Sequence, residues 1–317
     1  MRTAIYLTLV IFISYSEILA QRLSKSSVEK LSKSVFEETT LTGLKFRSIG
    51  PAQTSGRVSD FAINPNNFKE YYVAAASGGV WKTVNAGTTY IPVFDEAGSY
   101  SIGCITMDPN NANVIWVGTG ENNNQRSVPY GDGVYKSIDG GETWKNMGLK
   151  SSEHIGKILV DPNNSNIIYV AAIGPLWSSG GERGVYKSVN GGETWRLMLG
   201  IDADTGINDL IMDPRDSQVI YAAAYQRRRH VFTYLGGGPS SGLHKSVDGG
   251  TTWVDINKGL PEVDMGRIGM AMAPSDPEVI YAIVEASEGK GGFFMSTNRG
   301  ASWKKQGNYS TSGNYYQ

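Results

Sequence analysis

The sequence predicts an all-β protein of the β-propeller class, with about five four-stranded blades visible. The first observation behind this prediction is a ten-residue segment, YKSIDGGETW at 135–144, whose copies begin at residues 81, 135, 186, 244 and 294. A near-constant period of about 50 residues is typical of repeat architectures. The second is a Pro/Asn/Asp turn that recurs ahead of each copy. The third is that each repeat has room for four short strands, and four-stranded sheets repeated around an axis form a propeller.

Each repeat resolves into four strands, which we name A to D in chain order. The five repeats span about 56–95, 100–149, 154–200, 207–257 and 266–306. In the second repeat the expected order is strand A at 102–107, a turn at 108–111, strand B at 114–118, a long polar loop, strand C at 134–137, the box turn at 138–142 and strand D at 143–147. Strand B is apolar on both sides in every repeat, which indicates a strand covered on both faces.

The two ends of the chain read differently from the repeats. Residues 1–20 have Arg2, an apolar stretch and Ala20 before Gln21, the pattern of a secretory signal peptide. We therefore expect a secreted, periplasmic or cell-surface protein that does not span a membrane. Residues 21–43 read as a linker or short helix. The strand-like segment at 44–49 and the start of a further repeat at 307–317 suggest that the repeats belong to a larger propeller with more blades.

Composition excludes several classes of function. The formal net charge is −1, from 29 basic and 30 acidic residues, so no overall basic field favours nucleic acid. The single cysteine, Cys104, rules out an internal disulfide and fits a buried thiol in a strand. No His/Cys/Asp cluster has metal-ligand spacing, and no phosphate or dinucleotide fingerprint is present. We expect no metal, no cofactor and no nucleic-acid partner.

The repeated box has a structural explanation. Asp or Asn side chains accept hydrogen bonds from nearby backbone N–H groups, glycine permits positive φ, and a tryptophan can bury its ring between neighbouring blades. The residues to which we assign this structural role are Ser137, Asp139, Gly141, Trp144, Ser188, Asn190, Gly192, Trp195, Ser246, Asp248, Gly250, Trp253, Asn298, Gly300 and Trp303.

Strand order predicts which face of the propeller carries function. In a four-stranded meander the A–B turns and the C–D boxes lie at one end of the sheet, and the B–C loops lie at the other. The B–C loops vary in length and sequence, at 121–133, 174–184, 225–242 and 285–292. Variable loops on a rigid scaffold are where binding residues usually lie. We therefore expect a protein, peptide or carbohydrate ligand on the B–C loop face.

The candidate binding residues come from these loops. Trp177 is suited to stacking on a sugar or filling a peptide pocket, although packing under its own loop is an alternative. The run Arg227–His230 suits a carboxylate or sulfate, although a solvated charge run needs no function. The full set of candidate ligand-binding residues is Trp177, Arg183, Tyr130, Arg126, Arg227, Arg228, Arg229, His230 and Tyr234.

A competing hypothesis is a glycoside hydrolase, which needs two carboxyl groups about 5–9.5 Å apart. Glu121 and Glu182 are the candidate catalytic residues, because both lie in B–C loops. The sequence does not provide their separation, so the enzyme stays an alternative to the binding module.

The boxes resemble the Asp-box, or BNR, motif Ser-x-Asp-x-Gly-x-Thr-Trp. Together with GRVSD at 56–60 and GGVWK at 78–82, they make residues 44–306 similar to the sortilin N-terminal domain and its bacterial secreted relatives. That resemblance implies a propeller that binds peptide or protein ligands. The chain resembles xyloglucanases and sialidases more weakly. The resemblance to xyloglucanases would place a catalytic Asp at Ser77, where no carboxylate stands, and the sialidase Arg motif is met only in part at 46–49.

Overall fold

The computed structural model describes residues 56–123 and 128–309. The chain divides into two compact units between Gly50 and Pro51, and every described residue belongs to the second unit. The predictions for residues 1–49 and 310–317, and the candidate Arg126, fall outside the described residues.

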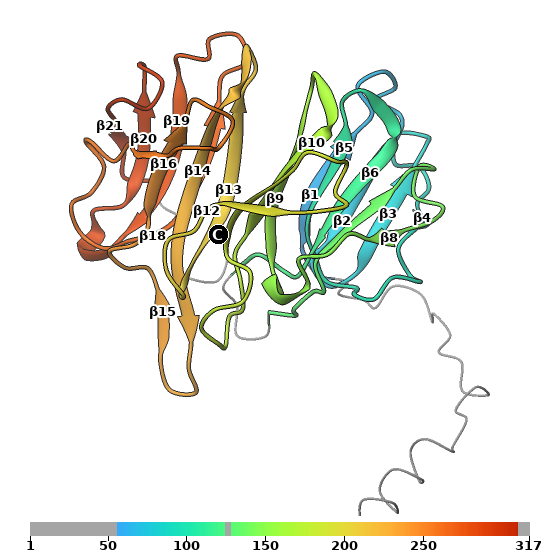
Figure 1. The fold of residues 1–317 in the computed structure, drawn as a ribbon, viewed down its shortest axis with the longest axis horizontal. Coiled ribbons are helices and arrows are strands. Elements are labelled where there is room, and N and C mark those ends of the chain that lie inside the picture. The colour runs from blue at the N-terminus through green and yellow to red at the C-terminus, as the bar shows by residue number, and fades with distance from the viewer. Residues whose placement is uncertain (1–55, 124–127, 310–317) are drawn as a thin grey trace, which may run out of the picture. The chain divides into compact units, whose positions relative to one another are not determined.

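Five antiparallel sheets follow one another along the chain, each built on four strands that pair in sequence order, and the fourth sheet has an additional strand, β15, paired with β14 (Figure 1). We call them blades 1 to 5. Blade 1 contains β1 (Val58–Ile63), β2 (Tyr71–Ala75), β3 (Gly79–Thr83) and β4 (Ile91–Pro92). Blade 2 contains β5 (Ile102–Asp108), β6 (Asn111–Thr119), β7 (Val134–Ser137) and β8 (Lys145–Asn146). Blade 3 contains β9 (Ile155–Asp161), β10 (Asn164–Ala172), β11 (Gly184–Ser188) and β12 (Arg196–Leu199). Blade 4 contains β13 (Thr205–Asp213), β14 (Asp216–Arg229), β15 (Tyr234–Gly236), β16 (Gly242–Ser246) and β17 (Val254–Asp255). Blade 5 contains β18 (Met265–Met272), β19 (Ile280–Ala286), β20 (Gly292–Ser296) and β21 (Lys304–Gly307). Short 3₁₀ turns lie at Lys150–Ser152 and Ser287–Gly289.

The blades stack through their faces. The A strands pack in succession, β1 on β5, β5 on β9, β9 on β13 and β13 on β18. A buried apolar cluster fills the space between each pair of consecutive blades. In blades 2, 3 and 4, strand B supplies side chains to the clusters on both of its faces, as the double-sided apolar pattern predicted; in β10, for example, Ile168 and Tyr169 are both fully buried and belong to different clusters. In blades 1 and 5, strand B contributes to one cluster. The all-β propeller prediction is confirmed as five such blades.

Strand D is shorter than the sequence indicates. In blade 2 it covers Lys145–Asn146 rather than 143–147. Thr143 belongs instead to the box turn, because its backbone N–H donates to Asp139 Oδ1 at 2.9 Å and its hydroxyl donates to Oδ2 at 2.5 Å. These bonds lower the pKa of Asp139 to about 2, with the Thr143 hydroxyl as the largest cause. A side chain that captures the backbone of the next residues competes with the strand ladder.

The box also joins consecutive blades through hydrogen bonds, which we call the blade latch. In the first latch, Tyr72 Oη and Lys82 Nζ of blade 1 donate to the Gly140 carbonyl of the blade 2 box, at 2.8 and 3.1 Å. Trp144 of that box donates back to the Val93 carbonyl of blade 1 at 2.6 Å. The tyrosine and lysine donors recur at Tyr169, Lys187, Tyr221 and Lys245, the lysine alone at Lys136, and the returning tryptophan at Trp195 and Trp303.

The latch differs at two tryptophans. Trp253 donates to Gly250 in its own box rather than to the preceding blade. Trp116 stands where the other B strands have a latch tyrosine, and its indole N–H has no hydrogen-bond partner among the described residues. Lys136 lies 4.8 Å from its ring centroid and still reaches the next box, at the Gly191 carbonyl, at 3.1 Å. The latch therefore keeps its lysine arm where the tyrosine arm is replaced.

Candidate ligand-binding site

The B–C loop face carries a hollow that we call the aromatic groove. Its volume is about 560 Å³, and it is lined by Gly98–Tyr100, Val128–Asp132, Glu153, His154 and Trp177. These segments are B–C loops and D–A connections of blades 1 to 3, so strand order places them all at the same end of their sheets. Three aromatic side chains on its rim are largely exposed: Tyr100 by 64%, Tyr130 by 73% and Trp177 by 54%.

Polar groups in the groove are held in defined positions. The Glu153 backbone is left-handed, with φ of 60°, and its carbonyl accepts a hydrogen bond from Gly131 N at 2.7 Å. A non-glycine residue in this conformation is strained, and such strain gathers at functional sites. Burial raises the pKa of the Glu153 carboxyl despite the opposing charges of Arg183 and Arg227. The groove thus contains a carboxyl group that is partly shielded from water.

His154 contributes a neutral ring. Its Nδ1 lies 2.8 Å from the Glu121 carbonyl, so this nitrogen carries the proton and donates. Burial, followed by the charges of Arg227 and Arg183, lowers the pKa of His154 well below its usual value. At neutral pH the unprotonated Nε2 is therefore an acceptor.

Asp132 also has a fixed position in the groove. It is anchored by Tyr135, whose hydroxyl donates to Asp132 Oδ2 at 2.5 Å.

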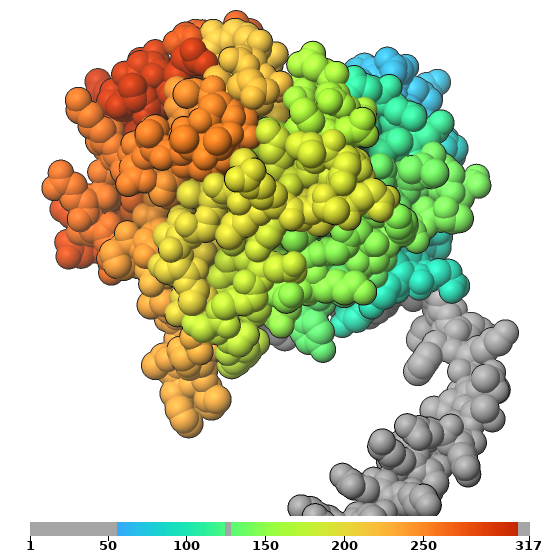
Figure 2. Space-filling model, in the orientation of Figure 1, coloured from blue at the N-terminus to red at the C-terminus, as the bar shows by residue number. Residues whose placement is uncertain are grey.

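A hairpin from blade 4 braces the groove at Trp177. Strand β14 runs past its blade and pairs with β15, and the hairpin stands out from the lower edge of the molecule (Figures 1 and 2). The Arg229 backbone N–H donates to the Leu176 carbonyl at 2.8 Å. The Arg229 guanidinium lies 5.9 Å from the Trp177 ring centroid and 4.7 Å from that of Tyr234. The hairpin therefore fixes both the loop and the indole beside it.

The remaining candidate arginines are engaged within the protein. Arg183 is 5% exposed, and its guanidinium donates to the carbonyls of Ile173, Pro175, Ser178 and Gly180 in its own loop. Arg227 is fully buried and donates to the Asn123 carbonyl at 3.1 Å. Arg228 pairs with Asp204 at 3.1 Å and also contacts Ser179. His230 lies at the exposed hairpin tip. Of the predicted ligand-binding residues that the structure describes, only Trp177 and Tyr130 line the aromatic groove.

The two candidate catalytic carboxylates, Glu121 and Glu182, are not brought together in the aromatic groove. Glu121 is 2% exposed, forms an ion pair with Arg57 and accepts a hydrogen bond from Asn123. Glu182 accepts hydrogen bonds from the Ser151 backbone N–H and hydroxyl, at 2.9 and 3.2 Å. Neither residue lines the aromatic groove.

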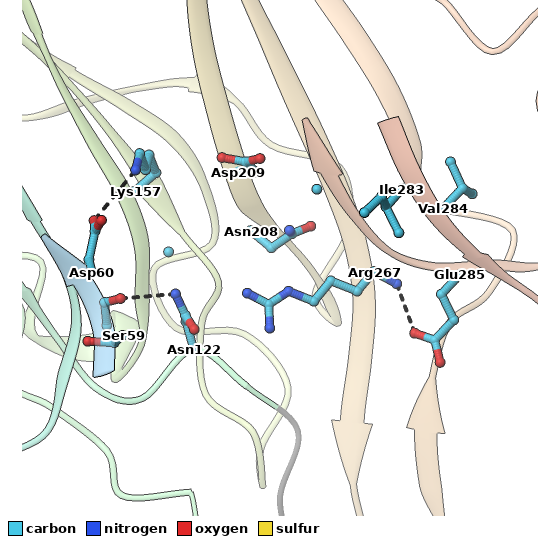
Figure 3. A pocket seen from close by; sticks show the side chains of 13 residues that line it. Ser59, Asp60, Asn122, Lys157, Asn208, Asp209, Arg267, Ile283, Val284 and Glu285 are labelled. Atoms are coloured by element: carbon cyan, nitrogen blue, oxygen red, sulfur yellow. Dashed lines mark hydrogen bonds and ion pairs between the residues drawn. The ribbon is translucent and has the colours of Figure 1, made fainter. Parts of the chain in front are cut away.

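A second hollow, the axial cavity, lies among the A strands and contains charges that the sequence analysis did not single out. It measures about 290 Å³, and all five blades contribute to its lining (Figure 3). Lys157 Nζ of blade 3 lies 3.5 Å from Asp60 Oδ2 of blade 1. Burial alone would lower the pKa of Lys157, but the neighbouring carboxylates raise it above the usual value. Figure 3 shows Arg267 of blade 5 extending toward Asn122 and Ser59.

Three of the charged residues that line the axial cavity share a position in the repeat, and this is visible in the sequence. Asp60, Lys157 and Asp209 each stand in strand A, five residues before the proline of the A–B turn. A charge repeated at one strand position indicates a shared polar environment. Burial raises the pKa of Asp209, although the backbone N–H of Met270 donates to it at 2.8 Å.

Among the described residues no group of three or more His, Cys, Asp or Glu side chains is placed to hold a metal ion. In the same part of the chain, no helix has the length and apolar character needed to cross a membrane.

No protein-family model matches this chain. It is similar to a xyloglucanase of Paenibacillus sp., 26% identical over 265 residues, covering 82% of this chain and 21% of the relative. A xyloglucanase of Hypocrea jecorina (strain QM6a) is 28% identical over 176 residues, covering 51% and 20%. The chain thus spans about a fifth of the length of these curated relatives.

Two solved structures share its fold. The Niastella koreensis GH74 enzyme superposes with a TM-score of 0.57 at 21% identity, covering 78% of this chain and 38% of that one. YCF48 bound to D1 peptide superposes with a TM-score of 0.50 at 13% identity, covering 86% and 74%. The described chain is therefore a series of five β-propeller blades that is similar in fold to part of the Niastella koreensis GH74 enzyme and to part of YCF48.

Proposed function

We propose that this protein is a ligand-binding propeller that takes a protein, peptide or glycan ligand on its B–C loop face, in the aromatic groove. The observation that carries the proposal is that three aromatic side chains, Tyr100, Tyr130 and Trp177, line a hollow of about 560 Å³. Each of the three side chains is more than half exposed. Exposed aromatic side chains lose little conformational entropy on binding and provide large contact areas for sugar rings or apolar side chains.

The polar lining of the groove supports the same proposal. Glu153, Asp132 and His154 supply hydrogen-bond acceptors beside the aromatic rim, and the hydroxyls of a sugar or the amides of a peptide are matching donors. Trp177 is held against Arg229 before any ligand arrives, so little ordering cost falls on this side chain.

The comparisons are consistent with either ligand class. YCF48 was solved bound to a peptide, and the curated relatives are xyloglucanases. The resemblance of the repeats to the sortilin N-terminal domain favours a polypeptide ligand. Because the chain spans about a fifth of the curated relatives' length, the ligand class is assigned by experiment and not by similarity.

The test is a screen of the chain against immobilised glycans and peptides, followed by calorimetry on each hit. We expect Trp177→Ala and Tyr130→Ala each to weaken binding about tenfold or more, the usual effect of truncating an aromatic hot spot. The matched control is Val189→Ala in the third box turn, where the side chain is 66% exposed on the opposite face. Equal affinities for all three variants would overturn the proposal.

A glycoside hydrolase is the second candidate, and the axial cavity is the observation that favours it. Asp60, Asp209 and Glu285 line that cavity, and the raised pKa of Asp209 suits a general acid. The presence of Ser77 where the xyloglucanase resemblance expects an Asp counts against it. Release of reducing sugar from a polysaccharide such as xyloglucan, lost in both Asp209→Asn and Glu285→Gln, would establish the enzyme instead.

We further propose that the protein is exported, on the signal-peptide pattern of residues 1–20. N-terminal sequencing of the protein from an expressing bacterial host tests this proposal. A mature terminus at Gln21 supports export, and an intact Met1 in the cytosolic fraction contradicts it.

A further inference from the structure

The side chains that line the aromatic groove offer hydrogen-bond acceptors but no lysine or arginine. Its lining includes two carboxyl groups, those of Asp132 and Glu153, and neither basic residue type among the described residues. Asp132 is already engaged by the Tyr135 hydroxyl. No hydrogen bond reaches the Glu153 carboxyl group within the described part of the chain. The groove therefore presents a carboxyl group that the protein itself leaves without a donor.

A second acceptor in the groove also lacks a donor. His154 lines the groove although it is only 1% exposed, and its Nδ1 is used in donating to the Glu121 carbonyl. Its Nε2 is left as an acceptor, and none of the described residues donates to it. A buried acceptor without a donor costs free energy. A ligand that donates hydrogen bonds removes this cost, and a ligand that only accepts them does not.

The Glu153 carboxyl group has a further reason to attract a cation. Burial raises its pKa, and the charges of Arg183 and Arg227 offset that effect only in part. Neither arginine lines the groove, and the Arg183 guanidinium is held by carbonyls of its own loop. An opposite charge within about 4–6 Å stabilises an ionised carboxylate. A cation placed inside the groove would supply that charge where the protein does not.

The rim of the groove adds aromatic faces to the carboxyl groups. Basic side chains bind over aromatic rings within about 6 Å of the ring centroid, and tryptophan is the strongest partner. Trp177 already has a guanidinium neighbour within the protein, because Arg229 lies 5.9 Å from its ring centroid. Tyr100 and Tyr130 present further rings that are more than half exposed. A neutral sugar could stack on the same rings, but it would leave the Glu153 charge without a counter-ion.

We propose that the aromatic groove binds a basic side chain, a lysine or an arginine, that a polypeptide partner presents. The cation lies against the rings of Tyr100, Tyr130 and Trp177. It donates hydrogen bonds to the Glu153 carboxylate and to His154 Nε2. This inference rests on the proposed function, since it concerns the same groove, and it selects a polypeptide rather than a glycan as the ligand.

The experiment is an array of peptides that share randomised flanks and differ at one central residue, which is lysine, arginine, acetyl-lysine or citrulline. Acetyl-lysine and citrulline keep nearly the length and shape of lysine and arginine but carry no charge. Calorimetry on the full chain then measures the affinity of the strongest basic peptide and of its uncharged counterpart. We expect the uncharged peptide to bind about tenfold more weakly, because it loses both the cation–π contact and the charge-assisted hydrogen bond.

Glu153→Gln assigns the effect of charge to one residue. This variant keeps the size of the side chain and removes its charge, so it should weaken binding of the basic peptide about tenfold and leave its uncharged counterpart nearly unchanged. The matched control is Glu142→Gln, in the second box turn at the opposite end of the blade, where the side chain is exposed. It should bind both peptides like wild type. Circular dichroism melts check that both variants are folded.

The outcomes separate this inference from the proposed function. Equal affinities for the charged and uncharged peptides, or equal effects of Glu153→Gln on both, overturn the cationic ligand. Preferential binding of a neutral oligosaccharide, or no binding of any basic peptide, also overturns it. If Trp177→Ala still weakens the binding that remains, the aromatic groove stays the binding site and only the ligand class is wrong. If Trp177→Ala has no effect on any ligand that binds, the proposed function fails as well.

Discussion

The latch between blades 3 and 4 gives a quantitative prediction. Tyr169 is fully buried, and its hydroxyl donates to the Gly249 carbonyl at 3.1 Å. Lys187 Nζ donates to the same oxygen at 2.8 Å and lies 5.0 Å from the Tyr169 ring centroid. In Tyr169→Phe the carbonyl keeps Lys187, so the loss is that of one hydrogen bond, about 1 kcal/mol. Lys187→Met keeps the tyrosine and costs about 1 kcal/mol for the same reason.

The double variant should cost more than this sum. Its Gly249 carbonyl has lost both partners, and an unsatisfied buried acceptor costs about 1–3 kcal/mol. We therefore expect a total of about 3 kcal/mol and a coupling energy of about 1 kcal/mol, measured by urea unfolding of the four proteins in the double-mutant cycle. Tyr71→Phe, which removes an exposed hydroxyl pair with Tyr90, is the control and should cost little. Additive costs, agreeing within about 0.3 kcal/mol, would refute the shared-acceptor argument.

Three further predictions concern the boxes and the loops. Gly192→Ala should lower stability by about 2 kcal/mol or more, seen as a lower melting temperature, because the backbone has φ of 92° and the new Cβ would lie 2.6 Å from the Trp116 ring. An unchanged melting temperature would show that the box moves freely. The pKa of Asp139 is lowered to about 2, below its unfolded value, so the stability it adds is complete above about pH 4 and is lost as pH falls toward 2. NMR titration of the carboxyl checks this value, and Asp139→Asn, which keeps the acceptor, should remove its share of the acid sensitivity. Arg183→Met should make the 174–184 loop more sensitive to limited proteolysis, because several carbonyls lose their donor; unchanged cleavage would contradict its bracing role.

The fold was predictable because its signals repeat. The five in-phase boxes, the turn prolines and the double-sided apolar strands all indicate the same four-stranded blade. A chance match to this pattern in one repeat would not recur in phase in the other four. Strand D was placed too long because the box side chain Asp139 captures the backbone of Thr143, a local competition that strand propensity does not register.

For the candidate groove, strand order predicts which face its loops share but not which side chains line it. Strand order correctly placed the B–C loops at one end, where Trp177 and Tyr130 line the groove. Burial in a non-repeating loop depends on contacts between blades. Arg183 and Arg227 therefore gave no sequence signal that their guanidinium groups are enclosed. The contributions of Tyr100 and Glu153 come from D–A connections, which no loop-length argument singled out.

Hydroxyl-radical footprinting of the chain, with and without a ligand found by the screen, tests the central claim most directly. The account predicts protection at Tyr100, Tyr130 and Trp177 on the B–C loop face, with Ile138 and Val247 of the box turns labelled equally in both states. All five side chains are exposed in the structure, so each can report. Protection confined to the box turns, with the three aromatic residues still labelled, would contradict it.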